Sequence, residues 1–312
     1  MTSPPSQAPP TVSTPSKPRI TSRLLATDPE SAEPSKPKIL LFGLPGVGKT
    51  WGAMDFPSVY YIDTEAGGDL KHYTAKLKAS GGMYMGPDKG SQDFDVILNQ
   101  IKALATEPHG FRTLVIDSIS KVYNCAINNE AERLGDKDAF GASKKPAIAQ
   151  MRRLVAWASR IDMNVIFIAH EKAEWGIDMR GERTQTGVTF DAWDKLEYEL
   201  HLVLHIVKRG SSRIAIVRKS RLEGFPDKAE MPWSYAEFAG RYGQDVIEAQ
   251  SHKMELATKD QLDNVARLLE VVRITEDEQA KWLHKANVTA FSEMEATTIE
   301  KIIKYLKGKV TS

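Results

Sequence analysis

The chain has 312 residues, the length of about two ordinary domains. Hydrophobic residues make up 41% of it and charged residues 27%, a composition that excludes a wholly disordered chain. The 42 Lys and Arg residues nearly balance the 41 Asp and Glu residues, which excludes a global basic field for nucleic acid but not a local patch.

The cysteine content and the hydropathy pattern restrict the cellular location. The single cysteine, Cys125, rules out an internal disulfide and a cysteine-based zinc site, and it favours a reducing compartment. No apolar run reaches the roughly 18 residues of a membrane span, and the first residues lack the apolar stretch of a signal peptide. We therefore expect a cytoplasmic protein without a membrane segment.

The first 37 residues differ from the rest of the chain because they contain nine of its 16 prolines. Pro, Ser and Thr dominate this segment, and residues 20–25 form its only apolar cluster. So little apolar surface does not offset the entropy of ordering the segment, which predicts a disordered tail over residues 1–37. The alternative is that residues 20–25 dock on a neighbouring subunit.

An apolar run at residues 38–42, bounded by Pro37 and Gly43, predicts a buried strand. The segment that follows matches G-x-x-x-x-G-K-[ST], and residues 51–54 can continue as a helix. Strand, glycine loop and helix in this order predict a phosphate-binding P-loop. Its expected nucleotide-binding residues are Gly43, Leu44, Pro45, Gly46, Val47, Gly48, Lys49 and Thr50.

The residue types of the P-loop predict ATP and Mg²⁺ as cofactors. Glycines let successive backbone N–H groups turn toward phosphate oxygens, where a Cβ would obstruct the approach. Lys49 would reach the β- and γ-phosphates, and the Thr50 hydroxyl would ligate Mg²⁺. A second carboxylate for the metal is expected at the end of a neighbouring strand, and Asp117 ends the apolar run 113–116. The alternative for Asp117 is an ordinary turn residue.

Two further predicted strands end in polar residues. Residues 58–62 are followed by Asp63 and Glu65, and ligands of open α/β sheets lie outside the carboxyl ends of the strands. Glu65 is our candidate for the base that accepts a proton from the attacking water, with Asp63 supporting it or the metal. The alternative is that both acids only cap the following turn. The strand 164–169 ends at His170, which we interpret as a γ-phosphate sensor rather than a structural histidine.

Together these motifs resemble the RecA-like core: the P-loop, Ile-Asp-x-Glu at 62–65, Leu-Val-Ile-Asp-Ser at 114–118 and the polar-ended strand at His170. The sequence Ala-His-Glu at 169–171 resembles, more closely, the compact RecA-like ATPases of bacteriophages that act as single-strand annealing recombinases. The resemblance covers roughly residues 38–235. It implies an α/β fold with a mostly parallel central sheet, DNA-stimulated ATP hydrolysis and a homo-oligomer with ATP sites at subunit interfaces.

The resemblance also gives a role to Lys219 and Arg221, which follow two predicted strands at 199–207 and 213–217. RecA-like filaments and ring helicases carry a Lys-x-Lys or Lys-x-Arg pair there that reaches the ATP site of the adjacent subunit. Such cations would neutralise charge on the γ-phosphate and make hydrolysis depend on assembly. The alternative is a solvated basic strand end.

Two segments are candidates for binding single-stranded DNA. Residues 171–193 have little apolar content and predict a mobile loop with at most a short hairpin, in the place where RecA-like proteins contact DNA. Residues 134–153 are the second candidate, and Trp175 and Phe140 are the rings on which bases could stack. The alternative for each is a solvated charged face. The cations expected to contact nucleic acid are Lys144, Lys145, Lys172, Arg180 and Arg183.

Three amphipathic segments near 258–269, 275–286 and 295–306 predict a small helical module. From Glu255 onward nine Lys and Arg face ten Asp and Glu, so the module is a poor DNA binder by charge. Docking of a single-strand-binding or replication protein is one role for it, and stability alone is the other. The expected domains are the tail at 1–37, a RecA-like ATPase domain at 38–250 and the helical module at 255–312.

Three functions remain open at this point. The first is an ATPase that binds single-stranded DNA and promotes annealing or strand exchange in phage recombination. The second is a P-loop ATPase of phage replication or packaging, of the helicase-loader or motor type. The third is a nucleotide-regulated scaffold with little hydrolysis, which would have no need of Glu65, His170, Lys219 or Arg221.

Overall fold

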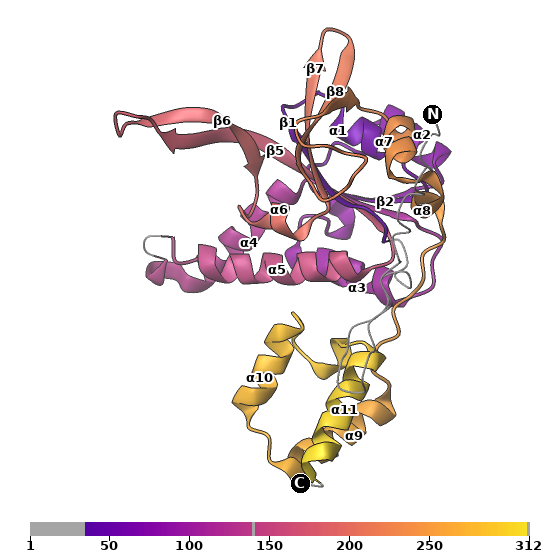
Figure 1. Cartoon of the computed structure of the whole chain (residues 1–312), viewed down its shortest axis with the longest axis vertical. Helices are drawn as coiled ribbons and strands as arrows, with labels where there is room; N and C mark the ends of the chain where they lie inside the picture. The colour runs from indigo at the N-terminus through magenta and orange to yellow at the C-terminus, as the bar shows by residue number, and fades with distance from the viewer. Residues whose placement is uncertain (1–34, 139–140, 311–312) are drawn as a thin grey trace, which may run out of the picture. The chain divides into compact units, whose positions relative to one another are not determined.

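The computed structural model describes residues 35–138 and 141–310 (Figure 1). The predicted tail therefore lies, but for its last three residues, outside the described residues, as does Phe140. Among the described residues no helix is both long and apolar enough to cross a membrane.

A nine-stranded sheet forms the centre of the described chain, with the strand order β3-β2-β4-β5-β1-β7-β8-β9 and β6 paired to β5. The strands from β3 to β7 in this order pair in parallel, and β6, β8 and β9 pair antiparallel. This mixed α/β architecture with a mostly parallel sheet confirms the predicted fold class. The strands are β1 (Lys38–Gly43), β2 (Val59–Asp63), β3 (Met83–Met85), β4 (Thr113–Asp117), β5 (Asn164–Ile177), β6 (Arg183–Asp191), β7 (Leu202–Arg209), β8 (Ser212–Ser220) and β9 (Glu230–Pro232).

Helices cover both faces of the sheet, and strand β1 shows why. Its side chains alternate between two hydrophobic clusters: Leu40 and Phe42 pack into one, Ile39 and Leu41 into the other. A strand buried on both faces is a continuous apolar run, as the sequence has it. The helices of the first cluster are α3 (Phe94–Thr106), α4 (Ile119–Leu134), α5 (Lys144–Arg160) and α6 (Leu196–Glu199); those of the second are α1 (Lys49–Ala53), α2 (Lys71–Ala79), α7 (Tyr235–Tyr242) and α8 (Gln244–Glu248).

The segment predicted as a mobile loop, 171–193, is instead largely a β-ribbon (Figure 1). β5 does not end at residue 169 but continues to Ile177, and it pairs with β6 from His170–Asp191 to Ile177–Arg183. The turn between them is closed by Asp178, whose carboxylate accepts hydrogen bonds from two backbone N–H groups. Backbone hydrogen bonds between β5 and β6 hold this ribbon together, so it forms without the apolar pattern from which a strand is predicted.

The C-terminal helices are α9 (Lys259–Val272), α10 (Glu276–Lys285) and α11 (Ala296–Val310), with two apolar clusters of their own. A capping box of Thr258 and Gln261 begins α9. The carboxylate of Glu293, between α10 and α11, contacts Lys102 of α3 at 2.5 Å and Arg153 of α5 at 2.9 Å. The division of the chain into an ATPase domain at 38–250 and a module at 255–312 stays a prediction.

A buried lysine links the stability of the fold to pH. The Lys38 ammonium is 5% exposed and donates to the carbonyl oxygens of Ile161 (2.7 Å) and Met163 (2.6 Å). Burial lowers its pKa from 10.5 to about 7, partly opposed by Asp162. Between these values the unfolded chain binds more protons than the folded one, so this lysine makes stability rise with pH.

We expect the free energy of unfolding of Lys38→Met to rise less steeply between about pH 7 and 10 than that of the wild type. Urea denaturation at a series of pH values measures this slope. The exposed Lys208 provides the matched control, because Lys208→Met removes the same charge without removing a buried one. Equal slopes for the wild type and Lys38→Met would contradict the assignment.

Candidate active site

The loop between β1 and α1 has the backbone that phosphate binding requires. Gly46 and Gly48 adopt φ angles of 75° and 93°, a left-handed region that disfavours side chains. The Lys49 ammonium donates to the carbonyl oxygens of Gly43 (2.8 Å) and Leu44 (2.9 Å), so its charge lies within the loop. Burial lowers the pKa of Lys49, and the carboxylates of Asp117, Glu65 and Glu171 oppose this shift.

Two residues that the sequence analysis missed hold this loop from outside. A Cβ on Gly48 would lie 2.3 Å from Nε of Arg213, so the Arg213 side chain packs directly on the loop. The Trp233 indole N–H donates to the Gly48 carbonyl at 3.1 Å, and its ring fills the space beside Gly52. No motif could have identified these contacts, because they depend on the register of β8 and the chain after β9.

Asp117, at the end of β4, lies next to the P-loop. Its Oδ2 accepts hydrogen bonds from the Thr50 hydroxyl (2.5 Å) and the Tyr61 hydroxyl (3.0 Å). Burial raises the pKa of Asp117 to about 6, although the two hydroxyls and Lys49 oppose the shift. A buried carboxylate joined to a hydroxyl is an all-oxygen set of the kind that Mg²⁺ prefers, so Thr50 and Asp117 fit the expected metal.

The side chains of Glu65, Ser118 and His170 meet at the carboxyl ends of β2, β4 and β5. The Ser118 hydroxyl donates to Glu65 Oε1 at 2.6 Å and lies 3.4 Å from His170 Nε2. His170 Nε2 also contacts Glu65 Oε1 directly. Because β5 lies between β1 and β4, His170 pairs with Gly43, the first residue of the P-loop. The predicted base and the predicted sensor therefore hydrogen-bond to each other beside the phosphate-binding loop.

Asp63 is buried beside Glu65 and holds the backbone of the loop after β2. Its Oδ1 accepts from the backbone N–H of Glu65 (2.9 Å), and its Oδ2 accepts from Gly68 N–H (2.7 Å) and the Tyr84 hydroxyl (3.1 Å). With both oxygens engaged and 1% exposure, Asp63 caps the loop after β2, and its support of the base or the metal stays a prediction. Its contribution is to fix the backbone from which Glu65 projects.

A second histidine–glutamate pair also escaped the sequence analysis. His205 Nε2 lies 2.8 Å from Glu171 Oε2, and the His205 ring stacks on Phe42 with centroids 4.6 Å apart. Phe42 immediately precedes the P-loop and Glu171 immediately follows His170. The pair therefore ties β7 to β5 across the P-loop strand, at the level of the site.

Lys219 and Arg221 lie away from the P-loop of their own chain. Lys219 pairs with Val203, which pairs with Leu40, three residues before Gly43 along β1 and roughly 10 Å from it. Lys219 donates to the Leu200 carbonyl, and the exposed Arg221 donates to the Tyr198 carbonyl. These cations therefore contact the amino-end edge of the sheet, whereas the phosphate loop is at its carboxyl end.

The five cations predicted to contact nucleic acid fall into two groups that the structure does not bring together. Lys144 and Lys145 are exposed in the first turn of α5. The other three belong to the ribbon: Lys172 contacts Asp191 (3.6 Å) and Asp194 (3.5 Å), Arg180 is exposed in the turn, and the Arg183 guanidinium lies 5.0 Å from the Trp175 ring centroid.

Comparison with known families decides the class of this site. Residues 35–229 match the family model described as AAA domain. The chain belongs to the AAA domain family. With the P-loop and the Thr50–Asp117 pair described above, this AAA-domain protein is a P-loop ATPase, a class that uses a nucleotide and typically Mg²⁺. No curated protein sequence matches this AAA-domain chain.

Two solved structures resemble this AAA-domain protein at low identity. One is the RadB recombinase, with 18% identity and a TM-score of 0.39 over 64% of this chain and 88% of that chain. The other is a prototypical ATPase from the type III secretion system of pathogenic bacteria, with 12% identity and a TM-score of 0.38 over 88% of this chain and 81% of that chain.

Proposed function

We propose that this ATPase uses ATP hydrolysis to control its hold on single-stranded DNA, and that it promotes annealing or strand exchange in phage DNA recombination. One observation carries the proposal. Strand β5 runs without a break from His170, which contacts the candidate base Glu65, to the exposed Trp175 on the ribbon. Five residues of extended strand, about 16 Å, join the site to the ribbon.

In the proposed reaction the P-loop glycines and Lys49 hold the phosphates, and Thr50 and Asp117 hold Mg²⁺. Bound MgATP would supply the phosphoryl group. Glu65 would accept the proton of the attacking water, and Ser118 and His170 would hold its carboxylate in position through the contacts described above. Loss of the γ-phosphate would change what His170 contacts, and His170 is part of the ribbon-forming strand.

The ribbon has the surface that a single strand of DNA requires. Trp175 is 54% exposed, and the Arg183 guanidinium covers part of its ring. Ile177 and Met179 are exposed beside it, with Arg180 in the turn. Aromatic rings that stack on bases, flanked by cations for the phosphates, bind single strands without sequence preference. Trp175 and Arg183 would form the centre of this surface.

The same proposal includes assembly. Because Lys219 and Arg221 do not reach the P-loop of their own chain, they would act at the ATP site of an adjacent subunit. The exposed Arg221 directly follows β8, so it can contact a neighbouring subunit without any change in the sheet. Hydrolysis would then depend on contact between subunits.

The decisive experiment measures ATPase activity with and without single-stranded DNA, together with annealing of complementary oligonucleotides. Stimulated turnover with annealing supports the proposal. Stimulated turnover on DNA without annealing would favour a motor or helicase loader of phage replication or packaging. ATP binding with negligible turnover would favour a nucleotide-regulated scaffold. An ATP turnover rate that is the same with and without single-stranded DNA would contradict the proposal.

Trp175→Ala is expected to weaken binding of a labelled single-stranded oligonucleotide by about 5- to 160-fold, because stacking on one base contributes about 1–3 kcal/mol. Basal ATPase activity without DNA should stay unchanged. Met179→Ala is the matched control, since Met179 is fully exposed on the same ribbon but has no ring. Fluorescence anisotropy at low and high salt measures the oligonucleotide affinity of both variants, and an affinity that does not change with salt would count against phosphate contacts.

A further inference from the structure

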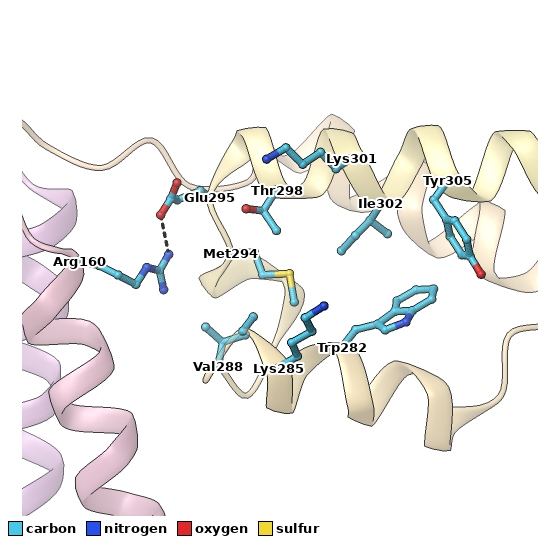
Figure 2. A pocket seen from close by; sticks show the side chains of 11 residues that line it. Arg160, Trp282, Lys285, Val288, Met294, Glu295, Thr298, Lys301, Ile302 and Tyr305 are labelled. Atoms are coloured by element: carbon cyan, nitrogen blue, oxygen red, sulfur yellow. Dashed lines mark hydrogen bonds and ion pairs between the residues drawn. The ribbon is translucent and has the colours of Figure 1, made fainter. Parts of the chain in front are cut away.

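A pocket among the C-terminal helices lies apart from the ATPase site and takes no part in the proposed function. It is open to solvent, has a volume of about 520 Å³ and is formed mainly between α10 and α11 (Figure 2). Pockets of roughly 300–1,000 Å³ accept small ligands or large side chains. The apolar side chains that line it are Trp282, Ala286, Val288, Met294, Ile302 and Tyr305.

The two aromatic residues give the pocket a defined wall. The Trp282 and Tyr305 rings meet edge to face, with centroids 5.9 Å apart and an interplanar angle of 86°. Figure 2 shows Trp282 on one helix facing Ile302 and Tyr305 on the other. Tyr305 is 51% exposed, so this apolar wall stays in contact with water. Burying it against another apolar side chain would be favourable.

The charges at the rim are unbalanced. Lys285 of α10 and Lys301 of α11 line the pocket, and neither side chain forms an ion pair or hydrogen bond within the described part of the chain. The one carboxylate of the lining, Glu295, is already paired with Arg160 at 3.3 Å. The rim is therefore positive, although the helical segment as a whole is nearly neutral.

We propose that this pocket docks a short acidic segment of a partner protein, with one aromatic or branched aliphatic side chain inserted between Trp282 and Ile302. Lys285 and Lys301 would pair with carboxylates on either side of the inserted residue. Buried aromatic anchors in well-packed pockets are the usual centre of such interfaces. The methyl and thioether groups of Val288, Met294 and Ile302 suit an apolar anchor and offer no hydrogen-bond donor to a nucleic-acid base.

The test uses the full-length protein and a fluorescein-labelled peptide of several aspartates followed by one phenylalanine. We expect saturable binding by fluorescence anisotropy. Replacing the aspartates with asparagine, or the phenylalanine with alanine, should each weaken it by about tenfold or more, because both the charge pairs and the anchor contribute. Binding that is equal for all three peptides would overturn the proposal.

The protein variants test the site itself. Lys285→Glu and Lys301→Glu should each lower the affinity for the aspartate peptide by roughly tenfold, and the affinity for the asparagine peptide by less. Lys304→Glu is the matched control, because it reverses the charge of an exposed lysine of α11 that does not line the pocket. ATPase activity of all three variants should match the wild type, so a failure here is separate from a failure of the proposed function.

Three outcomes would overturn the proposal. The first is peptide affinity that is equal in Lys285→Glu, Lys301→Glu and the control. The second is displacement of the peptide from the wild type by a single-stranded oligonucleotide that binds as tightly as the peptide, with loss of this oligonucleotide binding in the lysine variants. That result would make the pocket a nucleic-acid site. The third is a change of oligomer mass in Lys285→Glu or Lys301→Glu by light scattering, which would make the occupant a second copy of this chain.

Discussion

Glu65→Gln is expected to lower ATP turnover by about 10²- to 10⁴-fold while ATP binding stays nearly unchanged. Glutamine has the shape of glutamate and can still accept a hydrogen bond from the Ser118 hydroxyl, so the geometry of the Glu65–Ser118–His170 group is kept. It cannot accept a proton from water at neutral pH. Steady-state ATPase assays and titration with a fluorescent ATP analogue measure the two quantities separately.

A second acid of the same region provides the control. Glu132 of α4 lines the polar cavity of about 440 Å³ onto which Glu65 also opens, but it is exposed and outside the P-loop contacts. Glu132→Gln should leave turnover within about twofold of the wild type, since surface substitutions are usually mild. Full turnover in Glu65→Gln would remove Glu65 from the role of base.

Arg221→Ala is expected to reduce turnover in the assembled protein by about 10³- to 10⁵-fold, the effect known for arginine fingers, without loss of nucleotide binding. The reason is geometric: Arg221 contacts the Tyr198 carbonyl at the amino end of the sheet, away from the P-loop of its own chain, so under the proposed function its charge acts on an adjacent subunit. ATPase activity per chain, measured over a range of protein concentrations, detects the dependence on assembly.

Mixing two inactive variants separates action within a chain from action between chains. In a mixture of Glu65→Gln and Arg221→Ala, the first supplies the arginine and the second supplies an intact base, so part of the turnover should return. Arg218→Ala is the matched control on the same strand, because Arg218 is already paired with Glu174 at 2.6 Å. Mixtures that stay inactive, or an Arg221→Ala variant with normal turnover, would contradict the proposed role.

The parts of the site that could be predicted are those with local sequence signals. The P-loop is a contiguous pattern between a strand and a helix, and Asp117, Glu65 and His170 each follow a recognisable apolar run. Their meeting at one edge then follows from parallel strand pairing. The C-terminal helices were also predictable, because Thr258 and Gln261 form a capping box and the apolar spacing is helical.

The missed residues have no local signal. Arg213, Trp233 and His205 reach the site only through the register of β7, β8 and the chain after β9. The ribbon was missed for a different reason. Most of its residues are half-buried or exposed on both faces, so its side chains alternate without a strong contrast in hydrophobicity, and a period of two cannot be detected.

The continuity of β5 has a mechanical consequence. The strand that brings His170 to Glu65 is also one arm of the ribbon, and its backbone is paired to β6 from His170 onward. A displacement of His170 would therefore be passed along the paired backbone of the ribbon to Trp175, where the pairing with β6 is irregular. Under the proposed function, each nucleotide state would correspond to an orientation of the ribbon, rather than to the ordering and melting of a loop.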